Sequence, residues 1–206
     1  MEYENSTKKN IREVALKLFK EKSFENVTLK EICEASGINK HTFYYYFKSK
    51  DELLNKYYKI PYKLTSYDLA TIMTADSYVE QLWLLNKNFV DFIADSGVSI
   101  IKQLIIKNLT NHHIGTFTVT EEFKELMKLQ YDIIRKGQAN GEILNKSEPE
   151  ALVLLLRQII HSTAATWSVK NGSFNYRDVT RFFFETILDV APSYRKMSDY
   201  NINDIF

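Results

Sequence analysis

The stretch VTLKEICEASGINKHTFYYYFKSKDELL, residues 27–54, decides the fold of this chain. Thr28 stands where a helix can begin, and Glu31, three residues later, can complete a capping box with it. Gly37 can end that helix in a left-handed turn, and Asn39 can cap the next helix. Two short capped helices joined by a glycine-containing turn predict a helix-turn-helix.

Small and apolar side chains stand where these two helices must approach each other. Cys33 lies four residues before Gly37, at a position that needs a small side chain. Ile32, Ile38 and Phe43 are expected to form the buried wedge between the helices. Cys33 is therefore predicted to be a buried, inert thiol rather than a redox sensor. It is also the only cysteine, so an internal disulfide is excluded.

Residues 43–47 are five consecutive aromatics, and a helix cannot bury all of them. At about 100° per residue, Phe43 and Phe47 fall on the same face and are predicted to contact the core. Tyr44 and Tyr46 flank that face. The opposite, outward face carries side chains that can contact DNA: His41, Thr42 and Tyr45.

The charge around this outward face is locally basic. Lys40, Lys48 and Lys50 surround it, and residues 38–50 contain no Asp or Glu. Threonine and aromatic groups can contact thymine methyls in a major groove, while lysines neutralise phosphates. Outward tyrosines can also be plain surface residues, but within a helix-turn-helix we favour DNA contact.

The rest of the chain also reads as helix, with few glycines and prolines to interrupt it. Thr110–Thr120 reads as a loop. Thr7, Ser49 and Ser147 are predicted caps, the last with Pro149 in the first helical turn. We expect an all-α fold of about nine helices and no strand, with these approximate ranges: 8–22, 29–36, 40–47, 50–59, 76–94, 98–109, 120–139, 148–170 and 177–190.

Composition limits the function classes. The formal net charge is +1, so nucleic-acid binding must come from a local patch. With neither an apolar signal core nor an apolar run that could span a bilayer, we expect a cytoplasmic protein with no membrane contact. No phosphate loop, nucleophile motif or metal-ligand spacing is present, so we predict neither an enzyme nor a cofactor. The adjacent His112 and His113 would point apart on a helix, which argues against a metal site.

Residues 7–56 resemble the N-terminal domain of the TetR family of bacterial transcriptional regulators. The match includes the capping Thr28, the Gly37-Ile38 turn and the Lys-Ser-Lys-Asp run that opens the fourth helix. It also includes these residues of the third helix: Thr42, Phe43, Tyr44 and Phe47. The resemblance implies three segments: a helix-turn-helix domain (1–56), a helical ligand-binding and dimerisation domain (57–192), and a flexible tail (193–206).

The resemblance also implies roles for the residues that match. Thr28, Tyr44 and Lys50 would hold phosphates. Asn39 and Lys48 complete the predicted DNA-binding set. At His41 the sequence departs from the family, in which small residues or proline are common. A second group of side chains would face base edges: Lys40, His41, Thr42 and Tyr45.

The helices expected at 148–170 and 177–190 are apolar on more than one side, so each must be buried on more than one side. A central core helix in a monomer would satisfy this pattern. The family instead pairs these two helices with their twins in a four-helix dimer interface. We favour the homodimer, because a palindromic double-stranded operator requires two recognition helices.

Residues 57–140 would hold a sensor for a small hydrophobic or aromatic effector, because aromatic side chains with a few polar groups suit such a cavity. The polar candidates are Asn86, Asn88, Gln103, His112 and His113, but most of the aromatic residues there could simply be core, and no pocket wall is assigned. We expect a repressor that an effector releases from DNA by population shift, with the fourth helix as the lever. The alternative is a regulator of the same fold without a small-molecule effector.

Overall fold

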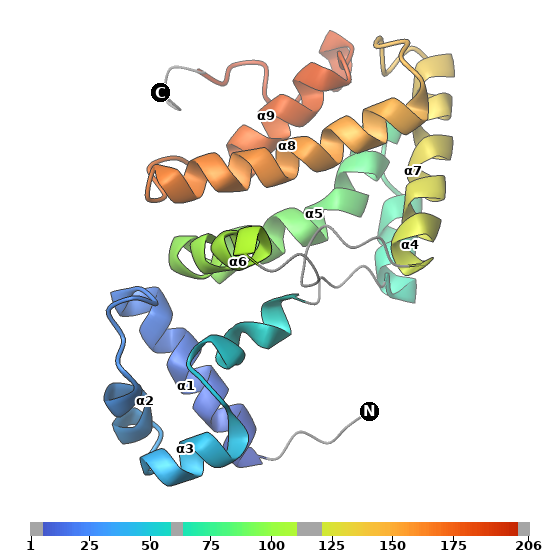
Figure 1. Ribbon diagram of the computed structural model, residues 1–206. Coiled ribbons are helices and arrows are strands. Elements are labelled where there is room, and N and C mark those ends of the chain that lie inside the picture. The colour runs from blue at the N-terminus through green and yellow to red at the C-terminus, as the bar shows by residue number, and fades with distance from the viewer. Residues whose placement is uncertain (1–5, 59–63, 111–120, 202–206) are drawn as a thin grey trace. The chain divides into compact units, whose positions relative to one another are not determined.

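The computed structural model describes residues 6–58, 64–110 and 121–201 (Figure 1). Within these ranges the chain is all-α, as predicted, and the sole β-type pairing is an isolated bridge between Ile143 and Val190. Contacts divide the chain into two compact units. The first comprises residues 1–60 and 96–117, and the second comprises residues 61–95 and 118–206.

The first unit is a helix-turn-helix supported by three further helices. Its core is apolar and completely enclosed, with Ile11, Phe19, Phe43 and Leu53 each 0% exposed. These side chains come from helices that lie far apart in sequence. The helices are α1 (Ser6–Lys22), α2 (Leu29–Ala35), α3 (Lys40–Tyr46), the 3₁₀ helix η1 (Asp51–Tyr58) and α6 (Val98–Thr110).

Helix α6 contacts α1 and η1, although it lies about forty residues beyond η1 in the sequence. The resemblance implied a second domain over residues 57–192, which includes residues 98–109. The contacts place them in the first unit, because Ile100, Ile101 and Leu104 are buried there. The first unit therefore consists of two separate segments of the chain.

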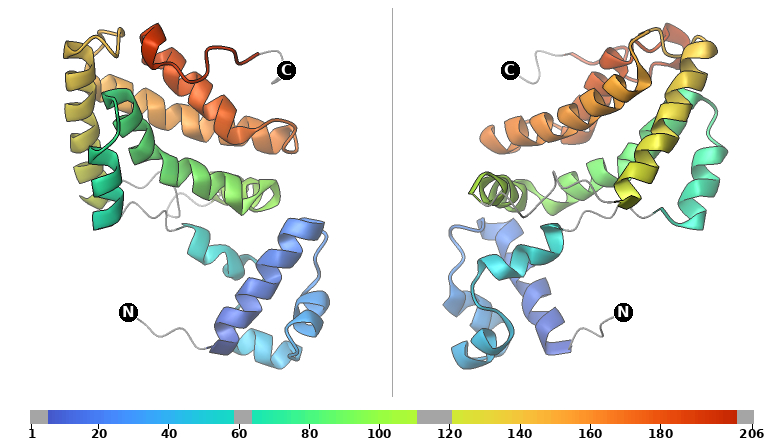
Figure 2. Two further views of the ribbon diagram at one scale, coloured as in Figure 1. Left: turned by 180° about the vertical axis from the view of Figure 1, so that it is seen from behind. Right: turned by 45° about the vertical axis from the view of Figure 1, so that its right-hand side comes forward.

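The second unit is built around the long helix α8. Helices α8 and α9 lie side by side, and α7 also packs on α8 (Figure 2). Leu152, Leu156, Val179 and Phe184 are among the buried side chains of α8 and α9. The helices of this unit are α4 (Ser66–Met73), α5 (Tyr78–Ser96), α7 (Glu121–Ala139), α8 (Pro149–Val169) and α9 (Tyr176–Ile187).

Four local predictions differ from the structure. The fourth helix, expected over 50–59, is the 3₁₀ helix η1, and α4 was not predicted. Ser147 does not cap α8, because Glu148 occupies the cap position without a side-chain hydrogen bond. Helix α9 begins at Tyr176, where the side chain of Asn175 accepts hydrogen bonds from two backbone N–H groups, and it ends three residues earlier than expected.

The segment after α9 also differs from the expected flexible tail. The backbone N–H groups of Lys196 and Met197 donate to the buried carboxylate of Glu185. Tyr200 contributes a ring that lies 5.4 Å from that of Phe182. Residues 193–201 are therefore packed on the second unit.

No described helix is both long and apolar enough to cross a membrane. The predicted loop Thr110–Thr120, apart from Thr110 at the end of α6, lies outside the described residues. So do His112 and His113, for which we predicted no metal site.

Candidate DNA interface

The predicted capping box begins α2. The Thr28 hydroxyl accepts a hydrogen bond from the Glu31 N–H at 3.2 Å, and the Glu31 carboxylate accepts one from the Thr28 N–H at 2.8 Å. Lys22 donates to the same carboxylate at 2.9 Å. The Thr28 N–H, followed by Lys22, lowers the pKa of Glu31 to about 2. Thr28 is exposed, and its hydroxyl is held in one orientation at the start of the helix.

The turn and the start of α3 also have the predicted geometry. Gly37 has φ +67°, which is the left-handed conformation that favours glycine. Asn39 caps α3, because its side-chain oxygen accepts the Thr42 N–H at 2.8 Å and the Thr42 hydroxyl at 3.1 Å. Asn39 and Thr42 therefore fix each other at the end of α3 that was predicted to enter the groove.

The aromatic run divides between two surfaces, as the helical geometry predicted. Phe43 is 0% and Phe47 1% exposed, whereas Tyr44 is 57% and Tyr45 78% exposed. Tyr46 is half-buried and forms an edge-to-face contact with Tyr45. Two of the five rings build the core, and two point away from it.

The wedge between α2 and α3 is more open than predicted. Ile32 and Phe43 are buried, but Ile38 is only half-buried. Cys33 is buried, and burial raises the pKa of its thiol. A raised pKa keeps the thiol protonated and unreactive, as we expected from its packing position.

Lys50 is placed differently from the other predicted phosphate ligands. Its ammonium donates to the carbonyl oxygens of Phe24 at 2.6 Å and Val27 at 2.8 Å. It also lies 4.3 Å from the centre of the Phe24 ring. Two of its three N–H groups therefore fasten the α1–α2 loop to the start of η1. Lys40, His41 and Lys48 are exposed instead.

Helix α6 also holds this loop. The Ser99 hydroxyl accepts the Phe24 N–H at 2.6 Å. Glu25 accepts a hydrogen bond from Gln103 at 2.7 Å and pairs with Lys102 at 3.6 Å. Gln103 was predicted as a polar candidate for the sensor. In the structure it belongs to the first unit, where it bonds Glu25 of the α1–α2 loop. Nothing in the sequence signals this contact, because its partners lie more than seventy residues apart.

Two other sensor candidates, Asn86 and Asn88, do come together, beside the aromatic Phe89. Asn86, Asn88 and Phe89 lie on α5 and line a cavity within the second unit. The sequence could not assign that wall, because the other lining residues come from α7 and α8.

Comparison with known proteins agrees with this geometry. Residues 11–57 match the family model for bacterial regulatory proteins of the tetR family. The chain is 26% identical over 137 residues to the HTH-type transcriptional regulator AcrR of Shigella flexneri. That match covers 66% of this chain and 52% of the relative, so the chain spans about half the length of the curated relative.

Solved structures of regulators share the fold. FadR of Bacillus subtilis, solved in complex with stearoyl-CoA, has a TM-score of 0.52 at 16% identity, covering 87% of this chain and 97% of FadR. A putative transcriptional regulator from Saccharomonospora viridis, solved in complex with choline, has a TM-score of 0.59 at 17% identity, covering 89% and 96%. With the helix-turn-helix geometry, the match over residues 11–57 identifies this part of the chain as a helix-turn-helix domain of the tetR family of bacterial regulatory proteins.

Proposed function

We propose that this chain is a homodimeric repressor that binds a palindromic operator and is released from it by a small-molecule effector. The observation that carries the proposal is the outward face of α3. Tyr44 and Tyr45 are more than half exposed at the same helix whose Phe43 and Phe47 are completely buried. Large aromatic side chains held this way on a short capped helix, among exposed lysines, suit a DNA groove.

The exposed members of the predicted set, together with the half-buried Thr42, would provide the contacts. Lys40, His41, Thr42 and Tyr45 would read base edges, while Thr28, Tyr44 and Lys48 would hold phosphates. Asn39 fixes the start of α3 by accepting from Thr42. We assign Lys50 a supporting role in addition to its predicted phosphate contact, because two backbone carbonyl groups already accept from its ammonium. A protein that acts on DNA in this way would work in the bacterial cytoplasm.

The exposed side of α8 supports the dimer. Leu154 is 53% and Leu155 45% exposed, and Ala151 and Gln158 continue the same stripe at helical spacing. Exposed leucines beside an already buried face leave apolar area for a second copy to cover. A dimer would present two recognition helices to two half-sites.

The fold of the second unit supports an effector, because the structures of FadR with stearoyl-CoA and of the Saccharomonospora viridis regulator with choline show related folds holding small molecules. Binding in the second unit would favour a state with wrongly spaced recognition helices. Two elements could transmit the change. One is η1, the predicted lever, and the other is α6, which follows α5 directly at Gly97 and holds the α1–α2 loop.

One observation favours a second candidate function. The cavity in the second unit has about 30 Å³ of open space, which is far below the usual volume of a ligand site. A regulator of the same fold without a small-molecule effector would need no larger space. Its second unit would only dimerise or bind a protein.

The experiment begins with an operator selected from a pool of random duplex DNA by the full-length protein. Gel-shift titrations then compare the protein with Tyr44→Ala and Thr42→Ala, for which we expect at least about tenfold weaker binding, or about 1.4 kcal/mol. Tyr67→Ala is the matched control, because Tyr67 is 80% exposed on α4 in the second unit. Unchanged affinity of both α3 variants would contradict the assignment.

A further inference from the structure

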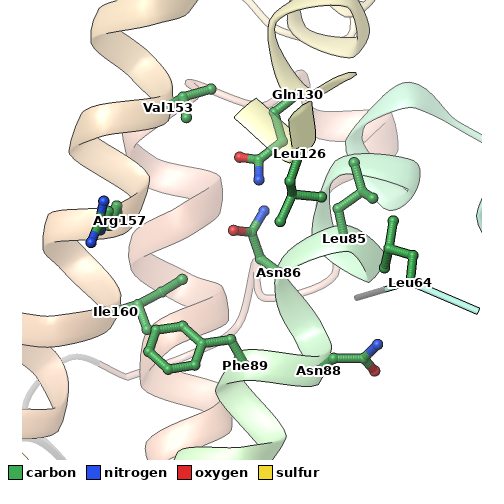
Figure 3. A pocket seen from close by; sticks show the side chains of 10 residues that line it. All are labelled: Leu64, Leu85, Asn86, Asn88, Phe89, Leu126, Gln130, Val153, Arg157 and Ile160. Atoms are coloured by element: carbon green, nitrogen blue, oxygen red, sulfur yellow. The ribbon is translucent and has the colours of Figure 1, made fainter. Parts of the chain in front are cut away.

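A cavity lies inside the second unit, between α5, α7 and α8 (Figure 3). Six of the ten side chains that line it are apolar, among them Leu85, Phe89 and Ile160. The other four are three carboxamides, from Asn86, Asn88 and Gln130, and one guanidinium, from Arg157. None of these ten is acidic, so the described wall combines apolar surface, neutral polar groups and a positive charge.

Gln130 is the most deeply buried of the four polar residues in this wall. It is only 3% exposed, and it lines the cavity from α7. Figure 3 shows the carboxamides of Gln130 and Asn86 facing each other across the cavity. Asn86 uses its NH₂ group on the carbonyl oxygen of Leu82, at 2.8 Å. The carboxamide of Gln130 can donate through its NH₂ group, so it is suited to a ligand acceptor in the cavity.

The charge of this wall comes from Arg157. His161, one turn further along α8, packs edge-on against Phe89 at 5.4 Å. Burial, followed by the charge of Arg157, lowers the pKa of His161 to about 4. At neutral pH the histidine is therefore uncharged, and the guanidinium remains the cationic group of the wall. Guanidinium groups bind carboxylates through paired hydrogen bonds.

The apolar lining sets the rest of the ligand. Its open space of about 30 Å³ admits one or two water molecules, so a ligand must separate the side chains as it enters. We propose that this cavity is the effector site of the regulator described above, and that it takes an amphipathic organic carboxylate. The apolar body would lie among Leu85, Phe89 and Ile160, with the carboxylate at Arg157 and Gln130. The role of this cavity as an effector site rests on the proposed function, whereas the binding of a carboxylate does not.

The first test uses three probes that share a chain length and differ in the head group: decanoate, decanol and decylammonium. Binding to the full-length protein is followed by the thermal midpoint and by titration calorimetry, since a ligand of the folded state raises the midpoint by mass action. We expect decanoate to bind at least about tenfold more tightly than either other probe. Equal or tighter binding of decanol or decylammonium would overturn the proposal, as would no binding of decanoate.

The second test removes the charge. In Arg157→Gln the advantage of decanoate over decanol should disappear, while decanol binding stays unchanged. Arg135→Gln is the matched control, because Arg135 lies on α7, outside the cavity, and pairs with Asp132 and Glu150 on the surface. An unaltered preference in Arg157→Gln, or an equal loss in Arg135→Gln, would refute the site. If Arg157→Gln does not fold, Gln130→Leu provides the same comparison, with weaker decanoate binding expected.

Operator binding separates the two proposals. If decanoate binds with the expected preference and weakens operator binding, both hold. If it binds while operator affinity is unchanged, the site stands and release by this ligand fails. If no probe shows the preference while the protein still binds its operator and the α3 variants do not, the carboxylate site is overturned and the DNA-binding function stands.

Discussion

The segment that we predict to face DNA, residues 27–47 (the DNA-facing segment), differs from the second unit in how far apart in the sequence its hydrogen-bonded side chains lie. In the DNA-facing segment each capping bond joins residues three apart, such as Thr28 with Glu31 and Asn39 with Thr42. In the second unit, Arg181 bonds Glu80 across 101 residues of sequence. The short bonds can be recognised in a sequence, and the long ones cannot. The predictions below test whether the two regions also differ in stability as this contrast implies.

The long-range bonds of the second unit meet at one buried arginine. Arg181 is 5% exposed and donates to Glu185 at 2.6 Å and to Glu80 at 3.0 Å. Its guanidinium also lies 4.8 Å from the centre of the Trp83 ring. Glu185 accepts in turn from the backbone N–H of Lys196. One charged group thus joins α5, α9 and the segment that follows α9.

The largest effect is therefore expected from Arg181→Ala. Removing the arginine leaves two carboxylates without their main partner, one of them 3% exposed, and should lower the free energy of unfolding by roughly 3–5 kcal/mol. Both tryptophans, Trp83 and Trp167, lie in the second unit, so urea titrations followed by tryptophan fluorescence report on that unit.

Arg135→Ala is the control for this prediction. Arg135 pairs with Asp132 at 3.0 Å, but its side chain is 55% exposed. An exposed pair contributes at most about 1 kcal/mol. If the two variants unfold at the same urea concentration, the buried cluster does not hold the second unit together.

Features that depend on neighbouring residues could be predicted from the sequence, and features that depend on distant residues could not. The helices of the DNA-binding motif, their caps and the direction of each aromatic ring were predictable, because each depends on residues at most a few positions apart. The position of the Lys50 ammonium was not predictable, because its acceptors are backbone carbonyl oxygens that lie 23 and 26 residues away in the sequence. Neither was the attachment of the final segment to Glu185.

Helix α4 was missed for a different reason. Its capping box, Thr65 with Asp68, is as local as that of α2. Its apolar side chains, however, do not form a buried stripe, since Ile72 is buried while Tyr67 and Met73 are largely exposed. The cap alone was present in the sequence, without the periodicity that supported the other helices.

Lys50→Met should give the next largest effect. Within the first unit it compares a lysine bonded to distant backbone carbonyls with an exposed lysine. The methionine keeps the length of the side chain but loses two charge-assisted bonds to backbone carbonyls, which we expect to cost roughly 1.5–3 kcal/mol. Lys48→Met is the matched change, because Lys48 is exposed. Its expected effect on stability is below about 0.5 kcal/mol.

Operator binding should rank these two variants differently. Lys48→Met is expected to weaken binding and reduce its dependence on salt without changing stability, because it removes only the phosphate contact that we propose for this lysine. Urea unfolding by circular dichroism and gel shifts at two salt concentrations measure both effects. Equal stability of the two variants would show that the bonds of Lys50 contribute little to the first unit.

A smaller effect, of about 1–2 kcal/mol, is expected from the titration of His161 in the second unit. Its pKa is lowered to about 4 in the folded chain, so the unfolded chain takes up this proton first as the pH falls. The stability that neutral His161 provides is complete above about pH 6.5 and is lost progressively towards pH 4. A change of one pKa unit corresponds to about 1.4 kcal/mol, and we reduce the full figure because the ring is not completely enclosed.

His161→Gln tests this expectation, because glutamine does not titrate. The difference in urea midpoint between pH 7 and pH 4, measured by tryptophan fluorescence, should be smaller in the variant than in the unchanged protein. A slope identical in both would mean that the histidine is accessible to protons in the folded state.

The smallest effect is expected at Glu31, where the local bonds of the DNA-facing segment can be tested directly. Its pKa is lowered to about 2 by the Thr28 N–H and by Lys22, so its contribution to stability is present above the ordinary carboxyl pKa and disappears as the pH falls towards 2. Glu31→Gln keeps a capping-box side chain that does not titrate. Amide exchange in α2 should lose protection between about pH 4.5 and 2 in the unchanged protein and hardly change in the variant. Because only the cap of one helix is involved, the exchange of α8 should be the same in both, and a parallel loss there would mean that the two regions do not respond separately.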